Sequence, residues 1–167
     1  VKAIQNCKEG SKILLLVPFP FHAKRNTKEE LNILLQKGFA RLYIVKEEKS
    51  KKKIAGRQGE TLSIDDLLEL GDKELNKQLK PADDGLKVYV LIDRLVAKAF
   101  DEDELHRISD SAGTAFYEGE GEMILEVDAK ELLHFSNKFE LDGILFEEPV
   151  PNLFSFNNPY GACPVCE

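Results

Sequence analysis

Cysteines and long hydrophobic runs are both scarce in this sequence. Three cysteines, Cys7, Cys163 and Cys166, occur among 167 residues, and a small, odd number argues against the disulfide framework of a secreted scaffold. The longest apolar run, residues 13–21, contains two prolines and is too short to span a bilayer. No signal peptide is recognisable. These absences predict a reducing, cytoplasmic compartment and no membrane partner.

Positive charge is in the minority. The sequence has 23 lysines and arginines against 30 aspartates and glutamates, which gives a net charge of -7. A field of that sign disfavours non-specific binding to DNA, although a local basic patch is compatible with it. The acidic surface suits solubility or a partner with cationic patches. Hydrophobic residues make up 43% of the sequence, which is enough to bury one ordinary core.

Common catalytic motifs are absent as well. The sequence contains no phosphate-binding loop of the G-x-x-x-x-G-K-S/T type and no H-E-x-x-H zinc helix. The histidines are scattered, and two serines have no evident histidine and acid partners; these residues are His22, His106, His134, Ser109 and Ser111. We therefore expect no catalysis by this chain.

The distribution of apolar residues predicts an α+β fold. Strands are expected over residues 12–19, 39–45, 86–96 and 122–127. Helices are expected over residues 2–9, from a capping box at 27–30 to Gly38, over 61–70 with Ser63 as the cap, over 101–117, and as a short turn at 128–133. Adjacent strands without intervening helices favour a largely antiparallel sheet flanked by helices. Residues 145–167 are expected to form an irregular C-terminal tail.

A run of lysines occurs between residues 46 and 53. Its simplest interpretation is a solvated hairpin tip, because no aromatic residues are interleaved to stack on bases. The functional alternative is a nucleic-acid-binding module in which the lysines and a zinc knuckle grip phosphate, with an affinity that falls steeply with salt. The lysines concerned are Lys46, Lys49, Lys51, Lys52 and Lys53.

Cys163 and Cys166 form a C-x-x-C pair, which is half of a common structural zinc site. Structural zinc usually needs four ligands, commonly from two such pairs. The remaining thiol, Cys7, is more consistent with a small core residue. A further hypothesis is that the pair belongs to a metal-dependent or redox enzyme. A thioredoxin-like pair, however, needs to lie at a helix N-terminus after a strand.

The residues around this pair resemble those of a known family. Residues 153–166, LFSFNNPYGACPVC, closely resemble a signature of the UvrA family, the damage sensors of the bacterial excinuclease. Residues 90–96, VLIDRLV, resemble the family's strand that ends in Asp-Arg. Residues 38–41, GFAR, and 107–115, RISDSAGTA, are similar to further family segments. Their order and spacing agree with the family along nearly the whole chain.

UvrA proteins are far longer and carry two ABC-type ATPase modules, whose motifs are absent here. The resemblance implies that residues 11–133 are the insertion in the first module that docks UvrB, the helicase-like partner that receives damaged DNA. Residues 1–10 are then the end of a lead-in helix, and residues 134–167 return toward the ATPase body. ATP, magnesium, damaged DNA and homodimerisation would belong to the longer parent. A chain that begins at Val1 is expected to be a fragment of it.

Two arginines are the docking residues that the resemblance implies, Arg41 in Gly-Phe-Ala-Arg and Arg94 in Asp-Arg-Leu. The planar guanidinium group of arginine pairs bidentately with a carboxylate, and the resemblance implies acidic residues on UvrB. The lysines of residues 46–53 would add steering toward an acidic partner. The alternative is that Arg94 pairs with Asp93 or with a helix end and has no docking role.

The resemblance also bears on zinc. Many family members carry an earlier C-x-x-C, and the four thiolates bind the metal. Here the corresponding residues, 138–145, contain no cysteine. Glu140 and Asp142 are possible substitutes, but two thiolates with two carboxylates are an uncommon structural set. We therefore expect Cys163 and Cys166 to be a half-site that has lost its metal, and no cofactor in this chain.

Overall fold

The computed structural model describes residues 1–22, 25–46, 58–79, 86–141, 143–146 and 150–154. Contacts divide the chain into a first unit, Val1–Ser136, and a second unit, Asn137–Glu167. The first unit contains helices α1 (Lys2–Gln5), α2 (Thr27–Gln36), α3 (Ile64–Glu69), α4 (Asp72–Leu79) and α5 (Glu102–Glu118). Its strands are β1 (Lys12–Pro18), β2 (Arg41–Lys46), β3 (Gln58–Ser63), β4 (Leu86–Val96), β5 (Glu122–Val127) and β6 (Glu131–Ser136).

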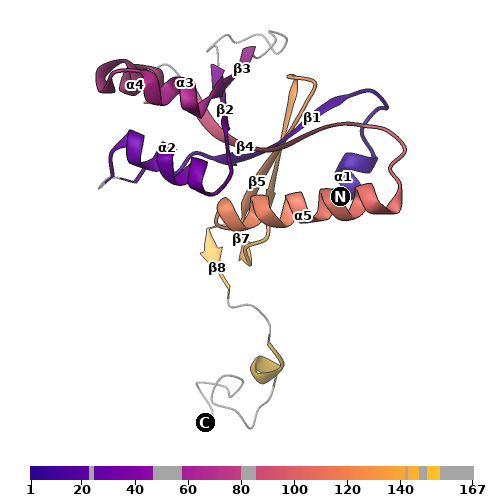
Figure 1. Ribbon diagram of the computed structural model, residues 1–167. Coiled ribbons are helices and arrows are strands. Elements are labelled where there is room, and N and C mark those ends of the chain that lie inside the picture. Colours follow the sequence, from indigo (N-terminus) through magenta and orange to yellow (C-terminus); the bar gives the residue numbers. More distant parts are fainter. Residues whose placement is uncertain (23–24, 47–57, 80–85, 142, 147–149, 155–167) are drawn as a thin grey trace, which may run out of the picture. The chain divides into compact units, whose positions relative to one another are not determined.

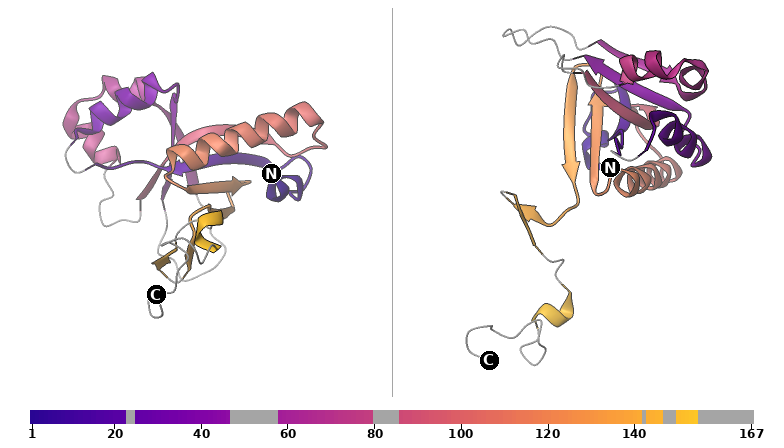
Figure 2. Two further views of the ribbon diagram at one scale, coloured as in Figure 1. Left: turned by 90° about the horizontal axis from the view of Figure 1, so that it is seen from below. Right: turned by 90° about the vertical axis from the view of Figure 1, so that its left-hand side faces the viewer.

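The strands of the first unit form one six-stranded sheet in the order β3-β2-β4-β1-β5-β6. Every pairing in this sheet is antiparallel. The helices pack on one face of the sheet, with α2, α3 and α4 near β2 and β3, and α5 along β1 and β5 (Figures 1 and 2). This arrangement confirms the prediction of an α+β fold with a largely antiparallel sheet and flanking helices.

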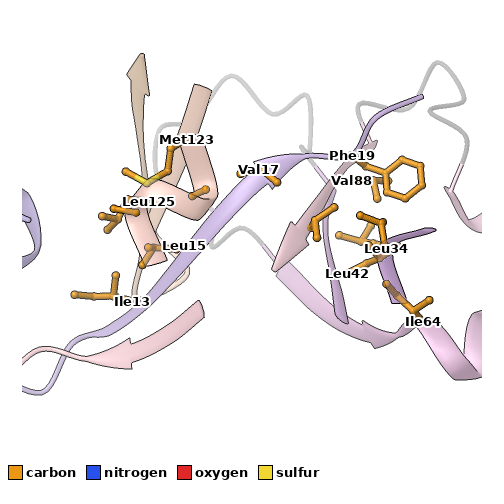
Figure 3. Close-up of a cluster of buried hydrophobic side chains, with 14 of the residues drawn as sticks. Ile13, Leu15, Val17, Phe19, Leu34, Leu42, Ile64, Val88, Met123 and Leu125 are labelled. Carbon is orange, nitrogen blue, oxygen red and sulfur yellow. The ribbon is translucent and has the colours of Figure 1, made fainter. Parts of the chain in front are cut away.

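The main core lies between the sheet and the helices, on what we call the helix face. Strand β1 runs through its middle and contributes alternate residues, which Figure 3 shows as two neighbouring groups along the strand. Ile13 and Leu15 pack near Met123 and Leu125 of β5. Farther along, Phe19 lies beside the group formed by Val88, Leu34, Leu42 and Ile64. The period of two along β1 thus connects the α5 half of the core to the α2 half.

The opposite face of the sheet, which we call the second face, carries a smaller buried cluster. Its members are Leu16, Tyr43, Val45, Tyr89, Leu91 and Ile124, with Leu14 and Leu132 packed against them. The hydroxyl of Tyr43 on β2 donates to Oε1 of Glu126 on β5 at 2.7 Å. Strands β4 and β1 lie between β2 and β5, and flat strands three positions apart would be separated by roughly 14 Å. The bond therefore indicates that the sheet curls toward the second face.

The short helix predicted at residues 128–133 is wrong. These residues form a turn that leads into the edge strand β6. Asp128 and Ala129 have φ angles of +52° and +56°, and Oδ1 of Asp128 accepts the backbone N–H of Lys12 at 2.8 Å. This bond and the pairing of β6 with β5 fix the left-handed turn, which overrides the helical propensity of residues 128–133.

The start of α2 also differs from the prediction by one residue. Its N-cap is Asn26, whose backbone N–H donates to the side chain of Glu29 at 3.3 Å. Thr27 is instead buried, and its hydroxyl donates to Oδ1 of Asn76 at 3.1 Å. The predicted end of the helix is confirmed, because Gly38 adopts a φ of +92° that favours glycine.

The second unit contains little regular structure among its described residues. A two-stranded hairpin, β7 (Glu140–Leu141) with β8 (Ile144–Leu145), is followed by the 3-10 helix η1 (Pro151–Phe154). Gly143 has a φ of +79°, as expected where a tight connection needs a left-handed residue. Across the part of the chain that the structure describes, no helix combines the length and apolar character of a membrane span.

Candidate functional site

Arg41, the first of the two predicted docking residues, begins strand β2. It lies opposite Ser63 of β3 and is exposed. Successive side chains of a strand point to opposite faces, so Arg41 shares a face with Tyr43, two residues later. Tyr43 belongs to the buried cluster of the second face. Arg41 therefore projects from the second face, away from the helices.

Arg94, the second predicted docking residue, lies near the end of β4 and is also exposed. Its partner across the sheet is Leu14 of β1, which packs against the second-face cluster. Residues directly opposite each other in an antiparallel pair have side chains on the same face. Arg94 therefore projects from the second face as well, together with Arg41.

The two arginines lie at neighbouring places on this face. Strands β2 and β4 are paired, with Leu42 opposite Val90, so the register places Arg41 beside Leu91. Arg94 is three residues farther along β4, which is roughly 10 Å at the usual rise of a strand. Within the described residues, neither guanidinium group has an ion pair or a side-chain hydrogen bond. The pair thus presents two exposed cations from one surface of an acidic chain.

Asp93 does not neutralise Arg94 in the way that the alternative interpretation supposed. Its carboxylate accepts the backbone N–H of Arg94 through Oδ1 at 2.7 Å, and its ion pair is made with a different arginine. Nη1 of Arg107 and the hydroxyl of Ser111, both on α5, donate to Oδ2 at 2.8 and 2.9 Å. The guanidinium group of Arg94 is therefore left for another partner.

The Tyr43–Glu126 bond lies on the second face, which also carries the two arginines, and is a buried polar contact. Both side chains are 4% exposed. Burial raises the pKa of the Tyr43 hydroxyl far above its ordinary range, and the hydrogen bond to Glu126 and its negative charge act in the same direction. Tyr43 consequently stays a neutral donor to the carboxylate and links β2 to β5 across the second face.

The lysine run is only partly covered by the structure. The backbone of Lys46 ends β2, opposite Gln58 and Leu86. The other predicted accessory lysines, Lys49, Lys51, Lys52 and Lys53, lie outside the described residues. Both the hairpin tip and the steering role stay predictions.

Cys163 and Cys166 also lie outside the described residues. Cys7 packs against the main core, as predicted, and its thiol donates to the carbonyl of Ala3 at 3.3 Å. Burial raises the pKa of this thiol, and the charges of Glu131 and Asp128 raise it further, which disfavours the thiolate that zinc requires.

The residues do not fit the four-thiolate zinc site of the resemblance, because the 167 residues contain three cysteines in all. Where the structure describes the chain, no group of three or more histidine, cysteine, aspartate and glutamate side chains is arranged to hold a metal. Nδ1 of His22 lies 2.8 Å from Oε1 of Glu30, and this pair is not part of a larger group of possible metal ligands among the described residues.

Two features near the arginines were not predicted from the sequence: the bonds of Asp93 to α5 and the bond between Tyr43 and Glu126. The sequence suggests Asp93 only as a partner for the side chain of Arg94. It offers Ser111 only as a serine without catalytic partners and Arg107 only as part of a family segment. Their spacing of four residues on a helix that follows the strand was a usable signal, because it puts both on one helix face. The link from Tyr43 to Glu126 has no local signal, since 83 residues separate them.

An antiparallel sheet with helices on one face and two exposed arginines on the other has the features of a binding module. The chain matches the family model described as "UvrA interaction domain" over residues 1–129, and it belongs to that family. This result confirms the family resemblance found in residues 38–41, 90–96 and 107–115.

Whole-chain relatives agree with this assignment. The chain is 30% identical over 180 residues to UvrABC system protein A of Rickettsia bellii, covering 100% of this chain and 16% of the relative. It is 31% identical over 169 residues to UvrABC system protein A of Staphylococcus aureus, covering 100% of this chain and 15% of the relative. The chain thus spans about one sixth of the length of the curated relatives it matches.

Proposed function

We propose that this chain is the part of a UvrA protein that docks UvrB during nucleotide excision repair. The observation that carries the proposal is the pair of exposed arginines, Arg41 and Arg94, on the second face of a sheet whose other face is covered by helices. Membership of the UvrA interaction domain family supports an interaction role. The relatives are named as parts of a UvrABC system, which supports a partner within that system.

The chemistry of the two arginines favours an acidic partner surface. A guanidinium group forms two parallel N–H···O bonds with a carboxylate, and this geometry gives specificity as well as binding energy. Elsewhere on the chain, acidic residues outnumber basic ones, so an acidic partner would be repelled from most of the surface. Two exposed cations on one face would therefore fix where the partner docks.

The longer parent would supply the activities that are not assigned to this chain. We propose that ATP and magnesium bind to its ATPase modules, that it holds damaged DNA as a homodimer in the cytoplasm, and that this chain contributes docking without catalysis. The lysines of residues 46–53 would steer UvrB toward the arginines, and Cys163 and Cys166 would carry no zinc.

Calorimetric titration of the chain with UvrB from the same organism tests the docking proposal. The variants are Arg41→Ala and Arg94→Ala, and the matched control is Arg25→Ala. Arg25 is also exposed, but it precedes α2 on the helix side and pairs with Glu30. An interface arginine that becomes desolvated contributes roughly 2 kcal/mol or more, or about thirtyfold in Kd, whereas an exposed surface pair contributes at most about 1 kcal/mol.

The expected result is tight binding by the original chain and by Arg25→Ala, with weakening of about thirtyfold or more in each of the other two variants. Equal affinity in all four proteins would remove Arg41 and Arg94 from the interface. No binding by any of them, with retained folding, would overturn the docking proposal. A parallel titration with duplex DNA identifies the case in which nucleic acid is the ligand, because that affinity falls steeply with salt.

A further inference from the structure

Strand β4 contains a bulge at Ile92, two residues before Arg94. Leu15 of β1 is opposite Asp93, but the next residue, Leu16, is opposite Leu91. Ile92 is thus an extra residue without a partner in β1. A bulge of this kind bends the strand and changes which way the following side chains point.

The bulge decides the face on which Arg94 lies. Before it, Val88 and Val90 belong to the helix-face core and Leu91 to the second face. After it, Leu95 belongs to the helix-face core although it is an odd number of residues from Val90. An unbroken alternation would put Arg94 with Val90, facing the helices, since a shift of one residue moves every side chain to the other face. The extra residue instead turns Arg94 outward.

Asp93 directly follows the extra residue, and its carboxylate bonds both to the backbone and to α5. Its Oδ1 accepts the N–H of Arg94 at 2.7 Å, and its Oδ2 accepts two bonds from α5. The donors on the helix, Arg107 and Ser111, are four residues apart and therefore lie on one helix face. The Asp93 side chain is 17% exposed, against 56% for Arg107. One carboxylate thus connects the bulged backbone to the helix behind it.

We propose that Asp93 is a positioning residue for Arg94. Its carboxylate fixes the bulge against α5 and so directs the Arg94 side chain onto the second face. This inference rests on the proposed docking function, because it concerns how one of the docking residues is oriented. Asp93 itself faces the helix side and does not contact the partner. It acts only through the conformation of the residue that follows it.

The direct test is a double-mutant cycle on UvrB binding. The proteins are the original chain, Asp93→Ala, Arg94→Ala and the double variant. Asp93→Ala is expected to weaken binding about five- to tenfold, and it should add nothing when Arg94 is already alanine. If the two effects on Kd multiply independently, Asp93 does not act through Arg94 and the inference is overturned.

Two further variants separate the bonds of Asp93. Asp93→Asn retains an oxygen that can accept the N–H of Arg94 but loses the ion pair with Arg107, so it is expected to recover part of the affinity lost in Asp93→Ala. It also serves where Asp93→Ala folds poorly. Ser111→Ala removes one tie to α5, and Ser109→Ala is its matched control, because Ser109 is exposed on the same helix. Affinity lost equally in both serine variants would count against the inference.

Amide hydrogen exchange at Arg94 gives a readout that needs no partner. In the free chain, Asp93→Ala is expected to accelerate exchange of this amide by about tenfold or more relative to neighbouring strand amides, and Ser109→Ala to leave it unchanged. Unchanged exchange in Asp93→Ala would overturn the positioning role even if docking is confirmed. Conversely, accelerated exchange together with no effect of Arg94→Ala on UvrB binding would refute the docking role of Arg94 and with it the step that depends on docking.

Discussion

Replacement of Tyr43 by phenylalanine tests whether the curled second face depends on the bond to Glu126. The substitution keeps the ring, which is buried among the side chains of the second face, and removes only the hydroxyl that donates to Oε1 at 2.7 Å. Glu126 is itself 4% exposed. The variant therefore leaves a buried carboxylate with one donor fewer, while the apolar packing is nearly unchanged.

The expected loss of stability follows from the type of bond. A hydrogen bond to a charged group contributes about 1.5–3 kcal/mol, and loss of one partner leaves the other's desolvation uncompensated. We expect Tyr43→Phe to lower the free energy of unfolding by about 2 kcal/mol, which corresponds to a fall in Tm of roughly 6 °C for a unit of this size. Urea unfolding followed by circular dichroism measures it. The control is Tyr117→Phe, because Tyr117 is 81% exposed and should change stability by less than about 0.5 kcal/mol.

The pH dependence provides a second readout with a defined sign. Burial, followed by the bond and the charge of Glu126, raises the pKa of Tyr43 in the folded state, whereas in the unfolded chain it is about 10. The folded state therefore keeps a proton that the unfolded state loses, so this contribution to stability is complete below about pH 10 and falls as the pH rises above it. The gap in stability between the original chain and Tyr43→Phe should narrow above that pH. A loss below about 0.5 kcal/mol at neutral pH, or a gap that widens at high pH, would refute the assignment.

Three other substitutions test the framework that carries the second face. Gly59→Ala should lower the free energy of unfolding by about 1–3 kcal/mol, since an added Cβ would lie 1.7 Å from the Tyr43 hydroxyl. The Tm of this variant should fall, and NMR should show that the Tyr43–Glu126 contact is lost. Leu15→Ala should lower the free energy of unfolding in urea by about 2–5 kcal/mol, because Leu15 is fully buried in the main core. Asp101→Ala should lower it by about 1 kcal/mol, because the Asp101 side chain accepts the N–H of Glu104 and caps α5; an unchanged Tm would show that packing alone fixes the start of that helix.

Long periodic segments of the fold were predictable from the sequence. The predicted strands at residues 86–96 and 122–127 agree with β4 and β5 to the residue, and the helix predicted from residue 101 agrees with α5 within one residue at each end. The apolar pattern favours each of these elements, and the capping box at Asp101 adds to it for α5, so local and tertiary preferences agree on their bounds.

Shorter elements were less predictable because their structure depends on distant partners. Helix α4 was not predicted, although Leu75 and Leu79, four residues apart, are both buried. Its many charged residues make the helical spacing of the two leucines hard to recognise in the sequence. The helix predicted at residues 128–133 is wrong because the turn before β6 is set by the bond of Asp128 to Lys12, 116 residues away. No local pattern contains that information.

The candidate site, too, was predictable from the sequence only in part. Arg41 and Arg94 were selected through a family resemblance, and the structure places both on the second face. Their role in docking stays a prediction. No residue type in 90–96, VLIDRLV, marks the one that lacks a partner in β1, and an unbroken alternation would place Arg94 with Val90. The bulge arises from the pairing of β4 with β1, which local periodicity does not encode.

The central position of β1 has a consequence for how the protein is made. This strand leaves the ribosome before the other strands of its sheet, yet both of its neighbours, β4 and β5, lie far later in the chain. Closing such distant pairings is slow, because the intervening chain has to be ordered before the contacts stabilise it. Until residue 127 has been synthesised, β1 lacks β5, one of its two neighbouring strands, and Tyr43 lacks its hydrogen-bond acceptor Glu126. A nascent chain is therefore expected to lack the complete second face, which carries Arg41 and Arg94, until synthesis has passed this point.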